Sequence, residues 1–220
     1  MLVGGRIVCV NQADPTESME EVSALLDWRR RIFELYSEIR ASPEPEWAWR
    51  KWREVRHELF ATHPQSPLSP QARAGFDGLD YYDYDPAFRV LADFQPADPE
   101  HYDIATSGTE PMRFVRRGIA TFQLQGRVVG LELYWLDTYG GGLFVPFRDS
   151  TSGVTTYGAG RYLLDTVKGA DLGMLYDRLV LDFNFAYNPS CSYDPRWVCP
   201  LATPANRIDV TIEAGERHPG

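Results

Sequence analysis

The spacing of apolar residues changes at a proline-rich connection, and this change constrains the fold more than any other feature of the sequence. The connection, residues 63–70, reads His-Pro-Gln-Ser-Pro-Leu-Ser-Pro, and its prolines end any helix that reaches it. Before it, apolar residues recur every three or four positions, whereas after it apolar and polar residues alternate. We therefore predict a helical extension over residues 1–63 and an antiparallel β domain over residues 64–220.

Two helices are predicted in the extension. Asp14 and Pro15 supply an N-cap and a proline at the first helical position, so the first helix should run from Asp14 to about Ile39. A second helix should begin at Ser42, where Pro43 gives the same kind of signal. The apolar side of this second helix carries Trp47, Trp52, Val55 and Leu59. We expect both helices to cover or flank the β domain.

Alternating residues predict the strands of the second part. A hairpin is expected from residues 119–124 and 128–135, joined by a turn at Gln125-Gly126. Further strands are predicted over residues 88–94, 143–147, 161–164, 179–183 and 208–212. Short strands at this spacing, with no helices between them, are typical of antiparallel sheets. The predicted fold class is therefore α+β, with two N-terminal helices followed by an antiparallel β-barrel or β-sandwich.

The balance of charge excludes two classes of partner. The chain has 31 acidic and 22 basic residues and a formal net charge of −9, and no basic patch interrupts it. Nucleic acids and anionic membrane surfaces are bound by clustered Lys and Arg. No apolar run approaches the roughly 18 residues of a membrane span, and residues 1–10 are too short for a complete signal peptide. We expect an acidic cytoplasmic protein with no nucleic-acid or membrane partner.

The cysteines leave several kinds of site open. Cys9, Cys191 and Cys199 form a sparse, odd-numbered set, so reduced thiols are the default. Seven residues separate Cys191 from Cys199, which also fits a small disulfide-closed loop or two of four zinc ligands. No Cys-x-x-Cys pair or adjacent His completes a zinc site. The sequence therefore assigns no metal and identifies no cofactor.

Polar residues gather between positions 180 and 206. Asp182 and Asn184 alternate with apolar residues and share one face of a predicted strand, which is either solvent or the lumen of a barrel. In the second case both side chains point into a cavity. Arg161 lies among tyrosines and glycines, and it either clamps a carboxylate or phosphate or pairs with Asp149 or Asp182 inside the fold.

The loop after this strand contains a candidate nucleophile. Cys191 follows Asn188-Pro189, and as a thiolate it would be nucleophilic. No His is fixed near it by a sequence signature, and a buried structural thiol is the alternative. The familiar enzyme motifs are absent, including phosphate-binding loops, zinc-protease helices, nucleophile elbows and paired carboxylates.

Several segments together resemble a known family. They are Leu143–Asp149 (LFVPFRD), Thr156–Leu163 (TYGAGRYL), Leu181–Asn184 (LDFN), Asn188–Tyr193 (NPSCSY), Cys199-Pro200 and Ala214–Glu216 (AGE). This combination is similar to the uncharacterised family known as domain of unknown function 1684, whose opening resembles residues 66–68 and 78–81. The resemblance implies a bacterial or archaeal single-domain protein with no established activity. Where the family usually has an acid before the late Asn, this chain has Ala205.

These observations lead to three hypotheses about function. The first is a small-molecule-binding β domain with a polar site near Arg161, Asp182 and Cys191. Its candidate ligand-binding residues, which match the polar signature of the family, are Arg161, Asp182, Asn184, Asn188, Cys191, Tyr193 and Cys199. The second is a hydrolase or transferase that uses Cys191, or Asp182 with Arg161 as charge stabiliser. The third is an interaction module that forms a homodimer through the Trp-rich helix.

Overall fold

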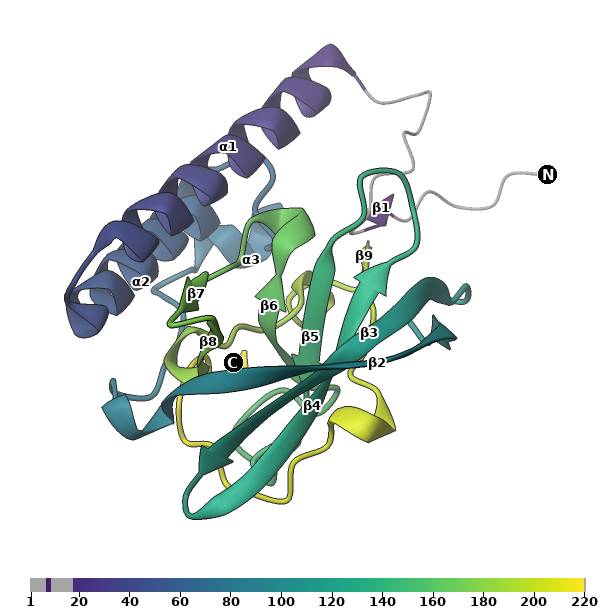
Figure 1. Ribbon diagram of the computed structural model, residues 1–220. Helices are drawn as coiled ribbons and strands as arrows, with labels where there is room; N and C mark the ends of the chain where they lie inside the picture. Colours follow the sequence, from purple (N-terminus) through teal and green to yellow (C-terminus); the bar gives the residue numbers. More distant parts are fainter. Residues whose placement is uncertain (1–6, 9–17, 220) are drawn as a thin grey trace.

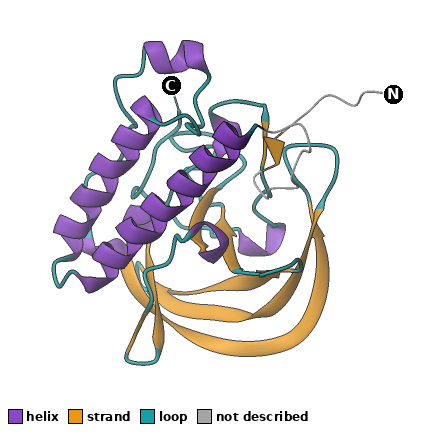
Figure 2. Cartoon of the chain, turned by 90° about the horizontal axis from the view of Figure 1, so that it is seen from above, coloured by secondary structure: helices purple, strands orange, loops and turns teal. Residues whose placement is uncertain are grey.

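Two long helices lie on one side of a curled antiparallel sheet. The computed structural model describes residues 7–8 and 18–219 (Figure 1). Helices α1 (Met19–Ala41) and α2 (Pro45–Thr62) form an antiparallel hairpin, and a short helix α3 (Pro70–Ala74) follows. Figure 2 shows the strands curving round one side of the molecule and the helix hairpin on the other. The predicted α+β class is confirmed, and the sheet is curled into a half-barrel.

The main sheet contains seven strands in the order β6-β5-β4-β3-β2-β8-β7, and every neighbouring pair is antiparallel. The strands are β2 (Arg89–Ile104), β3 (Met112–Leu124), β4 (Arg127–Leu136), β5 (Leu143–Phe147), β6 (Arg161–Asp165), β7 (Met174–Leu175) and β8 (Arg178–Asp182). A separate parallel pair joins β1 (Ile7–Val8) to β9 (Trp197–Val198). The predicted β3–β4 hairpin is confirmed, and both of its turn residues, Gln125 and Gly126, have positive φ.

Both helices begin later than the sequence predicted. The predicted cap Asp14 lies outside the described residues, and α1 is capped by Ser18. The Ser18 hydroxyl accepts a hydrogen bond from the Glu21 amide at 3.2 Å, and the Glu21 carboxylate accepts one from the Ser18 amide at 2.8 Å. This capping box fixes the first turn. Helix α2 is preceded by Glu44 at the cap position and starts at Pro45, because Ser42 forms a turn with Glu44 instead.

Two apolar cores lie on opposite sides of the sheet. The first fills the curl of the strands and includes Phe122, Leu131, Phe147 and Phe183. The second lies between the sheet and the helix hairpin and includes Trp52, Tyr134, Phe144 and Tyr162. Strands β5 and β6 are therefore covered on both faces, and consecutive residues along them are buried.

The predicted strand at residues 208–212 is wrong. Ile208, Val210 and Ile212 are buried in the first core and the residues between them are exposed, as the alternation indicated. The segment nevertheless joins no sheet, since its backbone–backbone hydrogen bonds, such as Ile208 N to Arg148 O at 2.7 Å, do not form a ladder. Alternation reports which side chains are buried, and an extended segment packed across the end of a sheet produces the same pattern.

Candidate functional site

The seven residues predicted as a site separate into two groups. Arg161, Asp182, Asn184 and Asn188 are buried and contact other parts of the chain. Cys191 and Tyr193 are half-buried in the loop after β8, where a short turn, η4 (Ser190–Ser192), places Cys191 beside the buried Cys199. Only the second group combines a reactive atom with access to solvent.

Arg161 fastens the segment 212–216 to the edge strand β6. Its guanidinium donates to the backbone carbonyls of Ile212 at 3.1 Å, of Ala214, and of Glu216 at 3.2 Å. The fourth partner is the carboxylate of Asp149 at 3.4 Å. Burial lowers the pKa of Arg161, and Asp149 opposes this shift. Of the alternatives left open by the sequence, the structure therefore has the internal pair with Asp149.

Asp182 and Asn184 connect three parts of the chain. Asp182 Oδ1 accepts hydrogen bonds from the Asn184 backbone amide at 3.0 Å and from its Nδ2 at 2.8 Å. The Asn184 side chain in turn bonds the amide and carbonyl of Asp85, and its own carbonyl accepts from the Trp49 indole at 3.0 Å. These side chains face neither solvent nor an open lumen. Asn184 joins η3 (Phe183–Phe185) to helix α2 and to the loop before β2.

Asp182 should make stability depend on pH. Its Oδ2 has no hydrogen-bond partner, Arg89 Nε lies 3.7 Å away, and burial raises the pKa from its ordinary value of 3.8 to about 6. The folded protein therefore binds this proton more tightly than the unfolded chain does, so stability falls as pH rises through this interval. Relative to wild type, Asp182→Asn should gain about 2 to 3 kcal/mol between pH 4 and 7.

Urea unfolding at several pH values measures this difference. Arg89→Gln is the matched comparison in the wild-type background. It removes the cation near Asp182, so the loss of stability with rising pH should become larger. A constant difference between Asp182→Asn and wild type across the range would contradict an Asp182 that is protonated near pH 6.

Asn188 and Tyr193 surround a carboxylate that the sequence analysis missed. Glu216 is 1% exposed, and its Oε2 accepts from Arg56 Nη2 at 2.9 Å and from the Asn188 amide at 2.8 Å. Its Oε1 accepts from the Tyr193 hydroxyl. The guanidinium of Arg56 is itself stacked on the Trp52 ring at 4.9 Å. This buried ion pair ties helix α2 to the end of the chain and to the loop that holds Cys191.

In the sequence, Glu216 was noticed only as part of a motif. The Ala-Gly-Glu triplet at 214–216 contributed to the family resemblance, but nothing in the sequence placed its acid opposite an arginine 160 residues away. Gly215 explains the middle position, because its φ is +77° and a Cβ there would lie 2.6 Å from the Ala186 carbonyl oxygen.

Cys191 and Cys199 form the most reactive arrangement among the described residues. The Cys191 amide donates to Cys199 Sγ at 3.4 Å. Cys199 is held in turn by Ser107, whose Oγ accepts from the Cys199 amide at 3.1 Å and whose own amide donates to the Cys199 carbonyl at 2.9 Å. Ser107, in the loop before β3, therefore holds the buried Cys199 next to the half-buried Cys191.

Hydrogen-bond donors converge on the Cys191 sulfur. The Cys199 thiol contributes most and the Ser107 and Tyr157 hydroxyls add to it, so the pKa of Cys191 falls to about 6 although burial opposes this. Tyr157 keeps its proton, because burial and the neighbouring Cys191 raise its pKa to about 12. The pKa of Cys191 is therefore lowered by hydrogen-bond donors rather than by a basic side chain.

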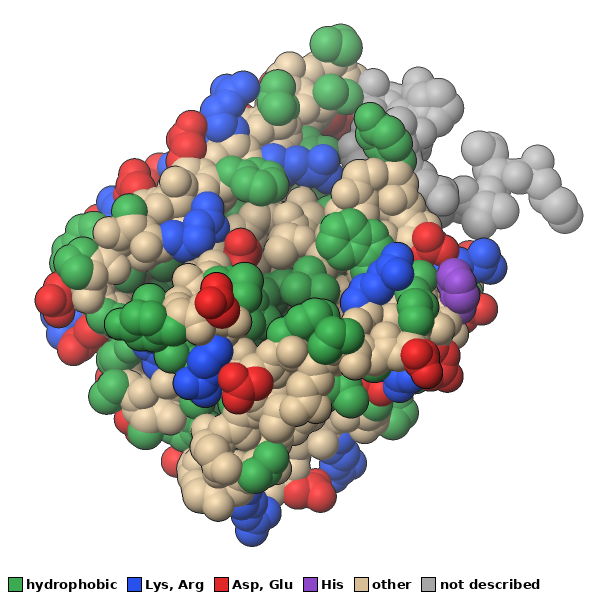
Figure 3. All heavy atoms as spheres, in the orientation of Figure 1, with side chains coloured by type: hydrophobic (Ala, Val, Ile, Leu, Met, Phe, Trp, Pro, Cys, Tyr) green, Lys and Arg blue, Asp and Glu red, His purple; other side chains and the backbone are tan. Residues whose placement is uncertain are grey.

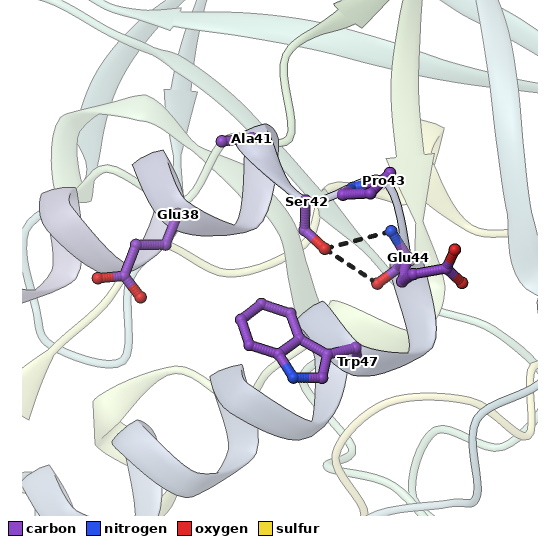
Figure 4. Close-up of a pocket in the computed structure, with 6 residues that line it drawn as sticks. All are labelled: Glu38, Ala41, Ser42, Pro43, Glu44 and Trp47. Carbon is purple, nitrogen blue, oxygen red and sulfur yellow. Dashed lines mark hydrogen bonds between the residues drawn. The ribbon is translucent and has the colours of Figure 1, made fainter.

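Elsewhere on the surface, three pockets are lined by described residues, and none of the three is lined by a residue of the predicted set. One, of about 510 Å³, lies at the corner between α1 and α2, where Figure 4 shows the carboxylates of Glu38 and Glu44 on either side of the Trp47 indole. A second, of about 20 Å³, lies by Lys168 and has room for one water. The third, of about 300 Å³, is lined by Arg50, Arg53, Glu54, His57, Leu79 and Tyr81.

The remaining surface favours neither a metal nor a polyanion. Among residues 7–8 and 18–219, no group of three or more His, Cys, Asp and Glu side chains could hold a metal ion. The face in Figure 3 mixes Lys and Arg with Asp and Glu and has no continuous basic area. In the described part of the chain, no helix is sufficiently long and apolar to cross a membrane.

Comparison with known proteins agrees with the resemblance seen in the sequence. A family model described as "Protein of unknown function (DUF1684)" matches residues 74–217, so the match starts at the end of α3. The solution NMR structure of an uncharacterised protein from Haloarcula marismortui is 36% identical, with a TM-score of 0.56, and the alignment covers 76% of this chain and 91% of that chain. Among curated proteins no match is found. Neither description names an activity or a ligand.

Proposed function

We propose that this chain, which belongs to the DUF1684 family of proteins of unknown function, carries out thiol–disulfide exchange at Cys191 with Cys199 as the resolving thiol. The observation that carries the proposal is the contact between the half-buried Cys191 and the sulfur of Cys199, at 3.4 Å from the Cys191 amide. Cys199 is fully buried, so it reacts with Cys191 rather than with molecules from solution. The proposed redox site therefore consists of Cys191 and Cys199, with Ser107 and Tyr157 as donors to Cys191.

The surroundings of Cys191 favour exchange with a disulfide over acyl transfer. A cysteine hydrolase needs a general base, usually a His, and donors aimed at a developing oxyanion. The described groups that bond Cys191 are a thiol, two hydroxyls and its backbone amide. These groups stabilise a thiolate but do not shuttle protons at neutral pH. Exchange requires only a thiolate, access to it and a second thiol.

The reaction takes place in two displacements. The Cys191 thiolate attacks one sulfur of a low-molecular-weight disulfide, so that a bond to Cys191 forms, the disulfide bond breaks and one thiolate leaves. The Cys199 sulfur then attacks Cys191, displaces the second thiolate and releases its proton to it. The two cysteines together lose two electrons, and the external disulfide gains them and becomes two thiols.

The pH dependence of alkylation tests the thiolate. With Cys9→Ser as background, the rate of Cys191 reaction with iodoacetamide should follow a pKa of about 6 and be constant above neutral pH. Tyr157→Phe and Cys199→Ala each remove a donor and should move this profile to higher pH. A profile centred on the ordinary thiol pKa of about 8.5 would overturn the proposal.

Reaction with an aromatic disulfide that releases a coloured thiolate tests the second displacement. The Cys9→Ser protein should release two equivalents and become lighter by two hydrogens. Cys199→Ser should release one equivalent and retain the aromatic thiol as a mixed disulfide, whereas Cys191→Ser should remain unreacted. Two equivalents with two retained aromatic thiols would show independent cysteines and contradict the resolving role of Cys199.

A further inference from the structure

The pocket of about 300 Å³ beside helix α2 contains a cation with no anionic partner. The half-buried Arg53 has its guanidinium 4.6 Å from the centre of the Trp49 ring and 4.8 Å from the centre of the Tyr81 ring. Among the described residues, no ion pair or hydrogen bond of this guanidinium is found.

We infer that this pocket binds a small organic oxyanion, with Arg53 as the residue that recognises its carboxylate or phosphate group. The N–H donors of a guanidinium lie in its plane, where they match two oxygens of one carboxylate or phosphate. Aromatic rings stacked on its faces leave these donors accessible at the edge. Stacking also fixes the side chain before a ligand arrives, so less conformational freedom is lost on binding.

The two aromatic neighbours of Arg53 are themselves held in place. The Tyr81 hydroxyl accepts a hydrogen bond from Arg56 Nε at 3.1 Å, and the Trp49 indole donates to the Asn184 carbonyl at 3.0 Å. The Trp49 contact is buried and the Tyr81 contact is partly buried. The position of Arg53 is therefore set by the second core rather than by the solvent-exposed face of α2.

The other lining residues add charge and one apolar contact. Arg50 and His57 lie one turn before and one turn after Arg53 on α2, so all three reach the same side of the helix. Arg50 is 70% exposed and pairs with Glu46 at 2.6 Å, which makes it a weaker partner for a ligand. Glu54 is the acidic residue of the lining, and its carboxylate lies 3.7 Å from Lys51 Nζ.

The size of the pocket limits the ligand to a small molecule. A volume of about 300 Å³ is at the lower end of the range for small-molecule sites. Leu79 and the Tyr81 ring give the body of the ligand an apolar surface, whereas Arg53 receives the charged end. This site does not include Cys191 or Cys199, so the inference does not rest on the redox chemistry proposed above.

Titration by NMR with two probes, inorganic phosphate and succinate, tests the inference on the full chain. Saturable shifts should appear for the Trp49 indole and for the amides of α2 near residue 53. Arg53→Gln should weaken binding about tenfold or more, and Arg53→Lys should weaken it less because it retains the charge but loses the planar donors. Arg30→Gln is the matched control, an exposed arginine of α1 without a described partner.

The outcomes separate the alternatives. Preference for phosphate or for succinate identifies which oxyanion the site recognises, and either one supports the inference. Shifts that do not saturate, or that respond equally to Arg53→Gln and Arg30→Gln, would overturn it as general attraction between anions and surface charge. The unfolding midpoint of each variant is measured in parallel, and a normal midpoint with lost binding assigns the loss to the pocket.

Discussion

Glu216→Ala is expected to lower the free energy of unfolding by about 3 to 5 kcal/mol. The substitution leaves Arg56, the Asn188 amide and the Tyr193 hydroxyl without the acceptor they share in the interior. Arg56 is 7% exposed and stacked on aromatic rings, so it cannot turn to solvent without disturbing helix α2. A buried charge without a partner costs far more than the pair itself contributes. Urea unfolding with an unchanged slope measures the loss.

Two further variants show whether charge is the cause. The double variant Arg56→Met/Glu216→Ala should recover part of the stability, because the buried cation is then also absent. Glu46→Gln breaks an exposed pair with Arg50 of similar length, 2.6 Å, and should cost less than about 1 kcal/mol. Equal losses for the exposed and the buried pair would contradict the importance of burial.

Arg161→Met should cost about 3 to 5 kcal/mol. The methionine side chain fills part of the space but donates no hydrogen bonds, so the carbonyls of Ile212, Ala214 and Glu216 lose their donor together. Asp149 loses its cation, although Thr151 and the Ile212 amide still donate to it. Arg161→Lys keeps the charge but lacks the planar set of guanidinium N–H donors. Its loss of unfolding free energy should therefore lie between those of wild type and Arg161→Met.

The same variant decides between a structural and a ligand-binding role for Arg161. If the side chain serves the fold, Arg161→Met shifts the urea midpoint, and amide hydrogen exchange increases in the segment 212–216. If it serves a ligand instead, the midpoint and exchange stay at the wild-type values. The second result would show that its contacts with the three carbonyls do not stabilise the fold.

Local signals were sufficient for much of the fold. The change of period at residues 63–70 separated helices from strands, and the Gln125-Gly126 turn fixed the β3–β4 hairpin. Prediction from the sequence failed where one residue pattern can arise from two different structures. At residues 208–212 burial alternates without strand pairing, and the start of α1 depends on the Ser18 capping box rather than on Asp14.

The candidate site was harder to predict because polar residue types do not reveal their surroundings. Arg161, Asp182 and Asn184 look like ligand contacts in the sequence. In the structure Arg161 and Asn184 bond distant backbone groups, and Asp182 bonds Asn184. The partners of Arg161 and Asn184 lie on segments that meet only in the folded chain. Cys191 and Cys199 could be considered together, because their spacing is short, but Ser107 and Tyr157 come from separate loops and no local pattern connects them with the thiols.

The pair between Arg56 and Glu216 also determines when the protein can finish folding during synthesis. The partners are 160 positions apart, so α1 and α2 leave the ribosome long before Glu216 is translated. Until then Trp52 and the rest of the apolar side of α2 have no complete sheet to pack against. Contacts of such long separation form late, and exposed apolar surface in a nascent chain promotes aggregation. During translation from residue 62 to residue 216, the apolar side of α2 is therefore not yet fully covered.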